Sequence, residues 1–432
     1  MKKDSGITLV TLAVTILIII ILAGVTINAT LGDNGLLKQA QDAKNLAEST
    51  TSETEDKMEE VLQEYKNVMA EDESINNPNT NTEPEDPVDP PESETPTVED
   101  SKNNGIEFKE DTEIEDVNGN KIIVPEGFKI ASDSGNTVQQ GIVIEDVSAS
   151  RDANVQGSQF VWIPVGKFIK DYGTEVNIIL GRYTFDKLNG TPSLQQAAYT
   201  TDNPKNYENS VVIESYFSEI AGAHRDGTAS NGLDGLNATA KNLADFVDSV
   251  KENRGYYIGR YEASFASGTS VDNYKAASKV STSYTNSMSV GRLWTGITQL
   301  DASKVAINTY NGTTIESDLM NSYAWDTAIV YMQESGYTNY ANRISVNSNL
   351  TNTGTIGDEA CNINDMASNL TEWTTEYSND SNGSNYAWPS TCRGGDSIRD
   401  SYYEYTAERQ HTTSNYTGGV SYNGFRLCLY IK

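Results

Sequence analysis

Residues 160–168, FVWIPVGKF, limit the kinds of fold that this chain can adopt. The first half of this stretch is rich in aromatic and β-branched residues, and Pro164 marks the end of that run. This pattern predicts a short buried strand. Outward from it, GYYIGRYEAS at 255–264 predicts further short strands. NLADFVDSVKEN at 242–253 and YAWDTAIVYMQES at 323–335 have apolar residues at helical spacing instead. This mixture predicts an α+β domain with long irregular loops.

Composition excludes several classes of function. The chain has 31 basic and 61 acidic residues, a formal charge of −30, so nucleic acid and anionic lipid head groups should be repelled. Its 3 cysteines are too few for a disulfide scaffold and match no zinc motif. Only His224 and His411 are available for histidine catalysis or a transition-metal site. Abundant Tyr, Asn, Thr and Ser with few Lys are typical of an extracellular surface.

Residues 7–31 predict a transmembrane helix. There is no charge from Ile7 to Ile27, which at about 1.5 Å per residue spans a hydrocarbon core of about 30 Å. Lysines before it and Asp33 after it keep the N-terminus cytoplasmic. The alternative is a secretory signal peptide, but the apolar run is longer than usual and no clean cleavage site follows.

The first residues, MKKDSG followed by ITLV, resemble the type IV prepilin family. The resemblance implies a leader at 1–6, cleavage after Gly6 by a prepilin peptidase, methylation of Ile7 and pilin subunits as partners. Thr11 stands where the family usually has the glutamate thought to pair with a neighbouring subunit. This departure favours a membrane-anchored pilin-like protein over a polymerising pilin.

Two further segments separate this helix from the globular part. After the GDNG turn, residues 36–70 have apolar residues at helical spacing and predict an amphipathic or coiled-coil stalk, or else a marginal solvated helix. Residues 71–104 are rich in proline and acids, which predicts a disordered, extended linker. Everything after this linker is expected outside the cell. The localisation predicted is therefore the cell membrane, with a single pass and an extracellular head, or a surface pilus.

The globular part resembles the formylglycine-generating enzyme family, or sulfatase-modifying factor domains. The resemblance covers residues 158–432, after a β-rich lead-in at 105–157, and implies a C-type-lectin-like fold. It rests on landmarks in one order: FVWIPVGKF, GYYIGRYEAS, RLWTGITQLDA, AWDTAIVYM, NINDMASNLTEW, RGG at 393–395 and GFRLCL at 424–429.

The same resemblance argues against catalysis. An active enzyme of this family needs two cysteines after RGG to bind copper and engage its substrate. Here those positions fall near Arg399 and Glu404, so no copper and no oxidase activity are expected. There is no G-x-S-x-G motif or phosphate-binding glycine loop either.

The resemblance also implies a calcium site in NDMASNLTEW. The oxygen ligands would be the carboxylates of Asp365 and Glu372 and the carbonyls of Ser368 and Leu370. Ser368 and Thr371 depart from the family's usual glycine and tryptophan. The alternative is that Glu372 pairs with an arginine such as Arg426. Trp373 is expected in the core.

The tail of the chain predicts a binding surface. Residues 374–423 are rich in Tyr, Asn, Ser, Thr, Asp and Gly, the composition of antibody-type binding sites. The contact residues expected are Trp388, Arg399, Tyr402, Tyr403 and Tyr405. The tail also resembles the variable regions of proteins diversified by retroelements. The alternative is a solvated loop that binds nothing.

The cysteines carry a separate expectation. Thiols outside the membrane tend to oxidise. If the strands of Cys392 and Cys428 are neighbours, as the family fold implies, these two residues could form a disulfide and leave Cys361 free.

Taken together, these features predict a displayed adhesin or receptor-like protein that is not an enzyme. Its ligand would be an extracellular glycan or protein. The alternative is a structural pilin-like subunit.

Overall fold

The computed structural model describes residues 95–197, 217–218, 243–284, 289–312, 314–347, 349–378, 390–397, 405–412 and 422–432. The chain divides into two units, residues 1–91 and 92–432, and all of the described residues belong to the second. The expected leader, membrane helix and stalk, with Gly6 and Ile7, lie outside the described residues. In the part that is described, no helix is long and apolar enough to cross a membrane.

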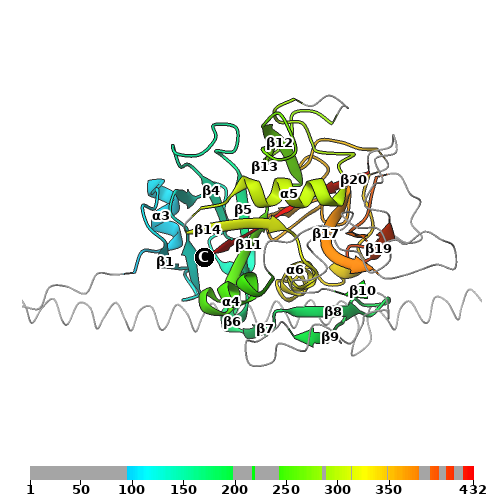
Figure 1. Cartoon of the computed structure of the whole chain (residues 1–432). Coiled ribbons are helices and arrows are strands. Elements are labelled where there is room, and N and C mark those ends of the chain that lie inside the picture. Colours follow the sequence, from blue (N-terminus) through cyan, green and yellow to red (C-terminus); the bar gives the residue numbers. More distant parts are fainter. Residues whose placement is uncertain are drawn as a thin grey trace, which may run out of the picture. The chain divides into compact units, whose positions relative to one another are not determined.

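The centre of the second unit is an antiparallel six-stranded sheet (Figure 1). Its strands, in spatial order, are β14 (Ile315–Leu319), β21 (Leu427–Ile431), β11 (Gly255–Gly259), β5 (Gln159–Pro164), β4 (Val143–Asp146) and β3 (Phe128–Ile130). FVWIPVGKF therefore supplies a central strand, β5, and GYYIGRYEAS supplies its neighbour, β11. Trp162 lies opposite Tyr257 in this pair, and their rings meet edge to face at 5.0 Å.

Helices cover both faces of this sheet. Helix α5 (Gln299–Thr309) leads into Tyr310, whose ring packs on Phe128 and Phe160 of one face. On the other face, Phe246 of α4 (Leu243–Asn253) packs against Tyr256, whose hydroxyl donates to Ala324 O of α6 (Ser322–Glu334). The helices predicted at 242–253 and 323–335 are thus confirmed within one residue at each end. The α+β class predicted from the sequence is confirmed as well.

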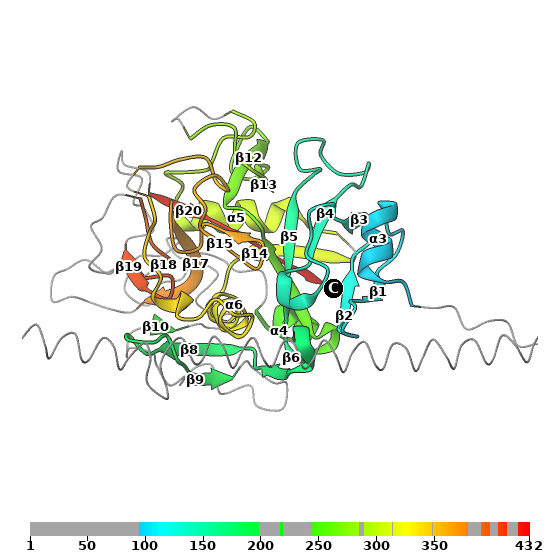
Figure 2. The ribbon, with the colours of Figure 1, turned by 180° about the vertical axis from the view of Figure 1, so that it is seen from behind.

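The segment before residue 158 differs from the prediction in two ways. Residues 98–104, assigned to the disordered linker, form helix α3 (Val98–Asn104), which packs beside β3 (Figure 2). Thr97 caps this helix, Gly105 ends it in the left-handed conformation, and the Val98 side chain is fully buried. Strands β3 and β4 belong to the central sheet, so residues 105–157 are part of the head and not a separate lead-in.

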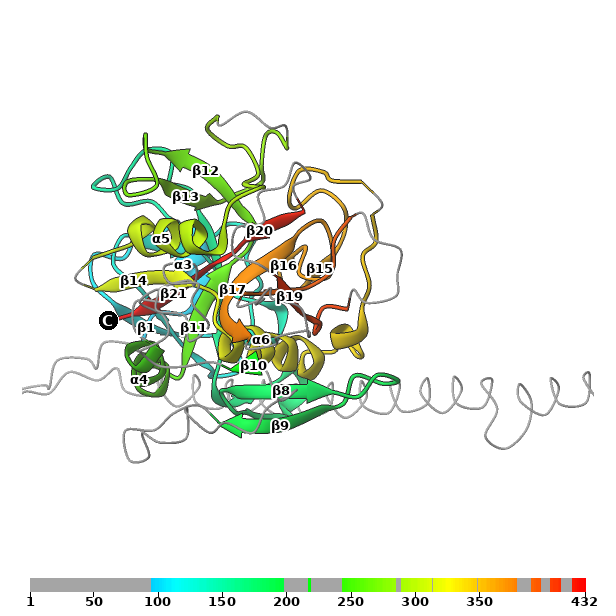
Figure 3. The same cartoon turned by 45° about the vertical axis from the view of Figure 1, so that its right-hand side comes forward.

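A second sheet carries the tail of the chain (Figure 3). Its order is β10 (Phe217–Ser218), β17 (Thr371–Ser378), β18 (Ser390–Arg393) and β19 (Arg409–Thr412), with β20 (Asn423–Phe425) parallel to β17. Residues 423–431 join the two sheets, because β20 continues into β21 after Arg426.

Shorter elements fill the edges of the unit. Five are two-stranded pairs: β1 (Thr112–Glu115) with β2 (Lys121–Val124), β6 (Gly166–Ile169) with β7 (Glu175–Ile178), β8 (Gly181–Phe185) with β9 (Pro192–Ala197), β12 (Ala263–Ser267) with β13 (Lys275–Ser278) and β15 (Glu359–Ala360) with β16 (Ile363–Asn364). Three are 3₁₀ turns: η1 (Val138–Gln140), η2 (Asp171–Gly173) and η4 (Tyr340–Asn342).

Candidate functional site

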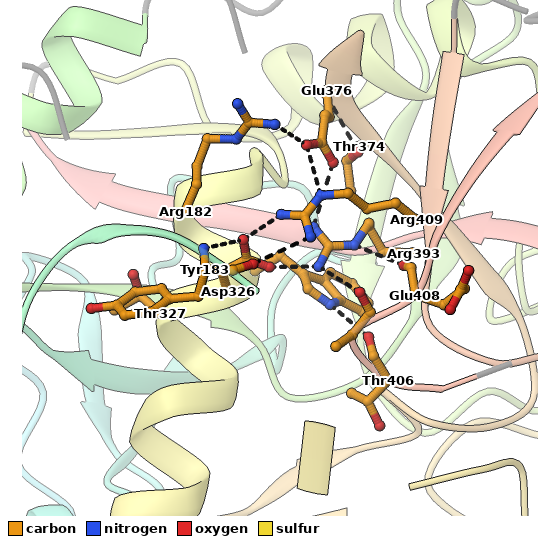
Figure 4. A network of polar contacts seen from close by, with 12 residues as sticks. Arg182, Tyr183, Asp326, Thr327, Thr374, Glu376, Arg393, Thr406, Glu408 and Arg409 are labelled. Atoms are coloured by element: carbon orange, nitrogen blue, oxygen red, sulfur yellow. Dashed lines mark hydrogen bonds and ion pairs between the residues drawn. The ribbon is translucent and has the colours of Figure 1, made fainter. Parts of the chain in front are cut away.

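The tail sheet (β10, β17, β18, β19 and β20) is anchored by a buried ionic network (Figure 4). The network comprises Arg182, Asp326, Glu376, Arg393 and Arg409, from β8, α6, β17, β18 and β19. Each side chain is at most 6% exposed. Five elements that are distant in sequence therefore meet at charged groups that water does not reach.

Arginine side chains that each bridge both carboxylates give the network its geometry. Arg393 contacts Asp326 Oδ1 through Nη2 at 2.5 Å and Glu376 Oε2 through Nη1 at 3.5 Å. Arg409 donates to Glu376 Oε1 through Nε at 2.9 Å, and its Nη2 contacts Asp326. Arg182 pairs with Glu376 as well. The planar guanidinium groups hold both carboxylates in fixed orientations.

The charges shift one another's pKa values. Burial alone would raise the pKa of Glu376, but Arg409, Arg182 and Arg393 together lower it to about 2. Burial and the neighbouring Arg409 lower the pKa of Arg393. Both residues stay charged at neutral pH, so the network is an ion cluster under ordinary conditions.

The same residues fix the turn before β19. Arg393 Nε donates to Glu408 O at 2.9 Å, and Trp325 Nε1 donates to Thr406 O at 2.9 Å. The Arg393 guanidinium lies over the Trp325 ring, 5.6 Å from a ring centroid. Gly394, next in the RGG motif, has a φ of 79°, and a Cβ there would lie 2.5 Å from Met366 O. The arrangement is suited to hold a rigid base.

Most of the expected contact residues lie outside the described parts of the chain. Trp388, Arg399, Tyr402 and Tyr403 are not among the described residues. Tyr405 is half-buried and forms an isolated antiparallel bridge with Ile344. The chain enters β18 two residues after Trp388, and the described part of the following turn ends at Ser397, two residues before Arg399. The expected contact residues therefore connect to opposite ends of one strand in the tail sheet.

Glu372 takes the alternative partner expected for it. Arg426 contacts Glu372 with Nη2 to Oε1 at 2.7 Å and Nε to Oε2 at 3.2 Å. Arg426 also donates to Gly259 O and Asn364 O, each at 2.7 Å, so it ties β11 and β16 to the tail sheet. Burial raises the pKa of Glu372 against the opposing effect of Arg426.

Two of the other expected calcium ligands have protein partners too. Asp365 Oδ2 accepts from Thr353 Oγ1 at 2.7 Å and from Gly354 N at 2.6 Å. The Ser368 carbonyl accepts from Leu370 N at 2.9 Å, and Leu370 N also donates to Glu262 Oε1 at 3.0 Å. Asp365 Oδ1 has no hydrogen-bond partner among the described residues, and burial raises the pKa of Asp365 to about 6. In the described parts of the chain, no group of three or more His, Cys, Asp or Glu side chains is placed to hold a metal.

Trp373 is fully buried, as expected, and its Nε1 donates to Ile297 O at 2.8 Å. The proposed pairing of Cys392 with Cys428 is not formed. Cys361, Cys392 and Cys428 are all buried, and none of them is in a disulfide. The reason is topological: Cys392 lies on β18 of the tail sheet and Cys428 on β21 of the central sheet, where it faces Ile258 and Asp318 in the ladders.

Sequence reasoning missed most of the ionic network. The sequence predicted no role for Arg182, Asp326, Glu376 or Arg409. It also predicted none for Glu262, which accepts from Asn369 Nδ2 at 2.6 Å. One signal was available: Asp326 interrupts the largely apolar run YAWDTAIVYM, and Glu262 follows the strand-like run GYYIG with Arg260 beside it. Acidic residues in such runs need buried partners.

Comparisons with known proteins add little. No protein family model and no curated protein matches the chain. A solved structure described as PvdO from Pseudomonas aeruginosa aligns with 41% of this chain and 81% of that one, at 12% identity and a TM-score of 0.25. A similarity at that score supports no argument about fold or activity.

Proposed function

We propose that the chain is a surface-displayed binding protein, adhesin-like or receptor-like, whose head presents the tail segments on a rigid sheet. The observation that carries this proposal is the buried ionic network beneath β17, β18 and β19. Binding residues tend to lie on loops that a rigid scaffold positions. A network of five buried charged side chains is a scaffold of this kind.

The tail composition supports the same function. Tyrosine offers a large and rigid contact area, and Asn, Ser and Gly offer adaptable hydrogen bonds. The proposed contact residues are Trp388, Arg399, Tyr402, Tyr403 and Tyr405, with an extracellular glycan or protein as ligand. In this proposal the head is a formylglycine-generating-enzyme-like variant of the C-type-lectin fold. It lacks the catalytic cysteines, because no cysteine lies between Cys392 and Cys428.

The anchor belongs to the same proposal. Residues 7–31 would hold the protein in the cell membrane after cleavage at Gly6, with the head outside. Mass spectrometry of the membrane-extracted protein should then find N-methyl-Ile7 as the first residue. A soluble product cut near Thr30 would support a secretory signal peptide instead.

A calcium ion bound near Asp365 also remains part of the proposal. Its unpartnered Oδ1 atom is an available oxygen ligand. Glu372 would have to share its carboxylate with Arg426, so a calcium titration should show at most weak binding.

The test of function is an array experiment with the full-length chain in detergent. Glycan and protein arrays should show at least one specific ligand. A variant with Tyr402, Tyr403 and Tyr405 all changed to Ala should lose at least tenfold in affinity. The matched control is Tyr337→Ala, which removes a tyrosine that is 40% exposed outside the tail.

Two outcomes would contradict the proposal. Binding that survives the triple substitution would place the ligand site elsewhere. A head that binds nothing, together with loss of filaments on deletion of the gene, would favour the structural pilin-like subunit.

A further inference from the structure

A pocket of about 320 Å³ lies at the end of α5 that is remote from the tail sheet. Three connections line it: the turn before β3, the loop after β4 and the turn between α5 and β14. Its lining is mostly polar and includes Glu126, Ser150, Arg151, Asp152, Lys275 and Tyr310. The volume falls at the lower end of the range for small-molecule sites.

Arg151 is built into the wall as a fixed donor. Its guanidinium lies over two neighbouring rings, 4.9 Å from the centroid of Phe128 and 5.0 Å from that of Tyr310. Nη2 donates to Glu126 O at 3.2 Å, and Nη1 lies 3.3 Å from Asp146 Oδ1. Tyr310 in turn donates its hydroxyl to Asp146 Oδ2 at 2.9 Å. These contacts orient the arginine before any ligand arrives, which reduces the entropic cost of binding.

The charges around the pocket are balanced. Arg151 and Lys275 are matched by Glu126 and Asp152 in the lining, and Asp146 lies behind Arg151. A phosphate or other dianion would meet these carboxylates as well as the cations. Hydroxyl groups of a ligand, in contrast, both donate and accept, so they suit a wall that holds acids, bases and the paired Ser148 and Ser150 hydroxyls.

We propose that this pocket binds a neutral saccharide unit of one or two sugar rings. The site is independent of the function proposed above. Gln299, at the start of α5, donates to Thr374 O in the tail sheet, whereas Thr309 and Tyr310 at the other end line the pocket. At about 1.5 Å per residue, the 11 residues of α5 separate the two places by about 16 Å.

Saturation-transfer NMR on the full-length chain, in a detergent without a sugar head group, tests the proposal. The probes are methyl mannoside, methyl galactoside and N-acetylglucosamine, with inorganic phosphate and glucuronate as charged probes. At least one neutral sugar should give a signal. Failure of all three neutral sugars, or signals from the charged probes alone, would overturn the proposal.

Pocket-filling variants decide where the sugar binds. Gly312 lies on the rim with an ordinary φ, and a Cβ there would lie 3.4 Å from its nearest neighbour, Ile315 O. Gly312→Trp and Ser150→Trp should each weaken the signal at least tenfold. Ala153→Trp is the control, because Ala153 is exposed in the same loop as Ser150 without lining the pocket. A signal unchanged in both filled variants would overturn the site.

The two sites can be told apart in the same experiment. The triple tyrosine variant of the tail should keep the sugar signal, and the filled variants should keep array binding. A sugar signal lost with the tyrosines would assign the sugar to the tail and refute the pocket.

Discussion

Glu376 is the residue on which the candidate site depends most, because three arginines share its carboxylate. Glu376→Gln removes the charge and keeps the shape, leaving those arginines with Asp326 as their remaining acid within the network. An uncompensated buried charge typically costs about 3–5 kcal/mol. We expect a loss of that order in the free energy of unfolding at pH 7, measured by urea denaturation.

The pH dependence of this loss has a definite sign. The pKa of Glu376 is about 2 in the folded protein, below its ordinary 4.5. The contribution of its charge to the free energy of unfolding is therefore fully present above pH 4.5. It disappears as the pH falls through 2, and the difference between wild type and variant should shrink accordingly. Glu334→Gln is the control, since Glu334 is 43% exposed and pairs with Lys170 at 3.7 Å. Equal losses in the two variants would contradict the role of the network.

Asp365 should show the opposite pH dependence. Burial raises its pKa from 3.8 to about 6, so the folded state keeps a proton that the unfolded chain releases. The charge of Asp365 destabilises the folded state fully above about pH 6 and not at all below pH 3.8. Asp365→Asn keeps an acceptor for Thr353 and Gly354 without a charge. Relative to wild type, the variant should gain up to about 3 kcal/mol between pH 4 and 7 in EDTA. A constant difference across this range would refute the assignment.

At the scale of single elements, the contact of β5 with β11 requires a glycine, Gly255, because a side chain there would collide with Trp162. A Cβ at Gly255 would lie 2.2 Å from Trp162 Cζ2, far inside van der Waals contact distance. Gly255→Ala should therefore lower the free energy of unfolding by about 1–3 kcal/mol through overpacking. Trp162→Leu in the same chain should recover part of this loss, giving a non-zero coupling in the double-mutant cycle.

The matched control for that substitution is Gly312→Ala, whose added Cβ makes only an ordinary contact. Its unfolding midpoint should match that of wild type. Purely additive losses from Gly255→Ala and Trp162→Leu would mean that the glycine serves the backbone and not the indole ring.

The elements also show what the sequence could and could not predict. Helices α4 and α6 and strand β5 follow from local periodicity, which a single stretch of sequence displays. Helix α3 was missed, because its sequence, VEDSKNN, has one large apolar residue and is stabilised by caps and by the burial of Val98. The partners of Arg393 lie 17 residues away in one case and 67 in another, and no local pattern encodes such pairings.

At the scale of the whole unit, one continuous core joins both sheets. Buried apolar side chains run in a single cluster from Val98 of α3 to Tyr430 of β21. The segment 423–431 contributes to both sheets, and Arg426 between its two strands ties Glu372 to Gly259 and Asn364. Continuity of this kind favours cooperative unfolding of the described head over separate opening of its sheets.

The three thiols test this cooperativity directly. Cys361, Cys392 and Cys428 lie between β15 and β16, on β18 and on β21, and none is more than 2% exposed. Burial raises the pKa of Cys361 to about 12 and also raises that of Cys428, so these two thiols should be protonated and unreactive in the native protein. Cys392 is shielded from reagents by its burial. Iodoacetamide should label no thiol in the native protein, and all three in urea without a reductant.

The rates at which the three cysteines are labelled provide a stronger test of cooperative unfolding. If the core opens as one unit, mass spectrometry of samples in low urea should find all three cysteines labelled with the same free energy of opening, equal to that of global unfolding. The result should hold on both sheets, because Arg426 ties Gly259 of β11 to Glu372 of β17. The ionic network adds an indirect link, since it joins the tail sheet to α6, which packs on the central sheet. Faster labelling of Cys392 alone would mean that the tail sheet opens before the central sheet. In that case the surface proposed to bind ligand would rest on a separate, weaker unit and not on a rigid base.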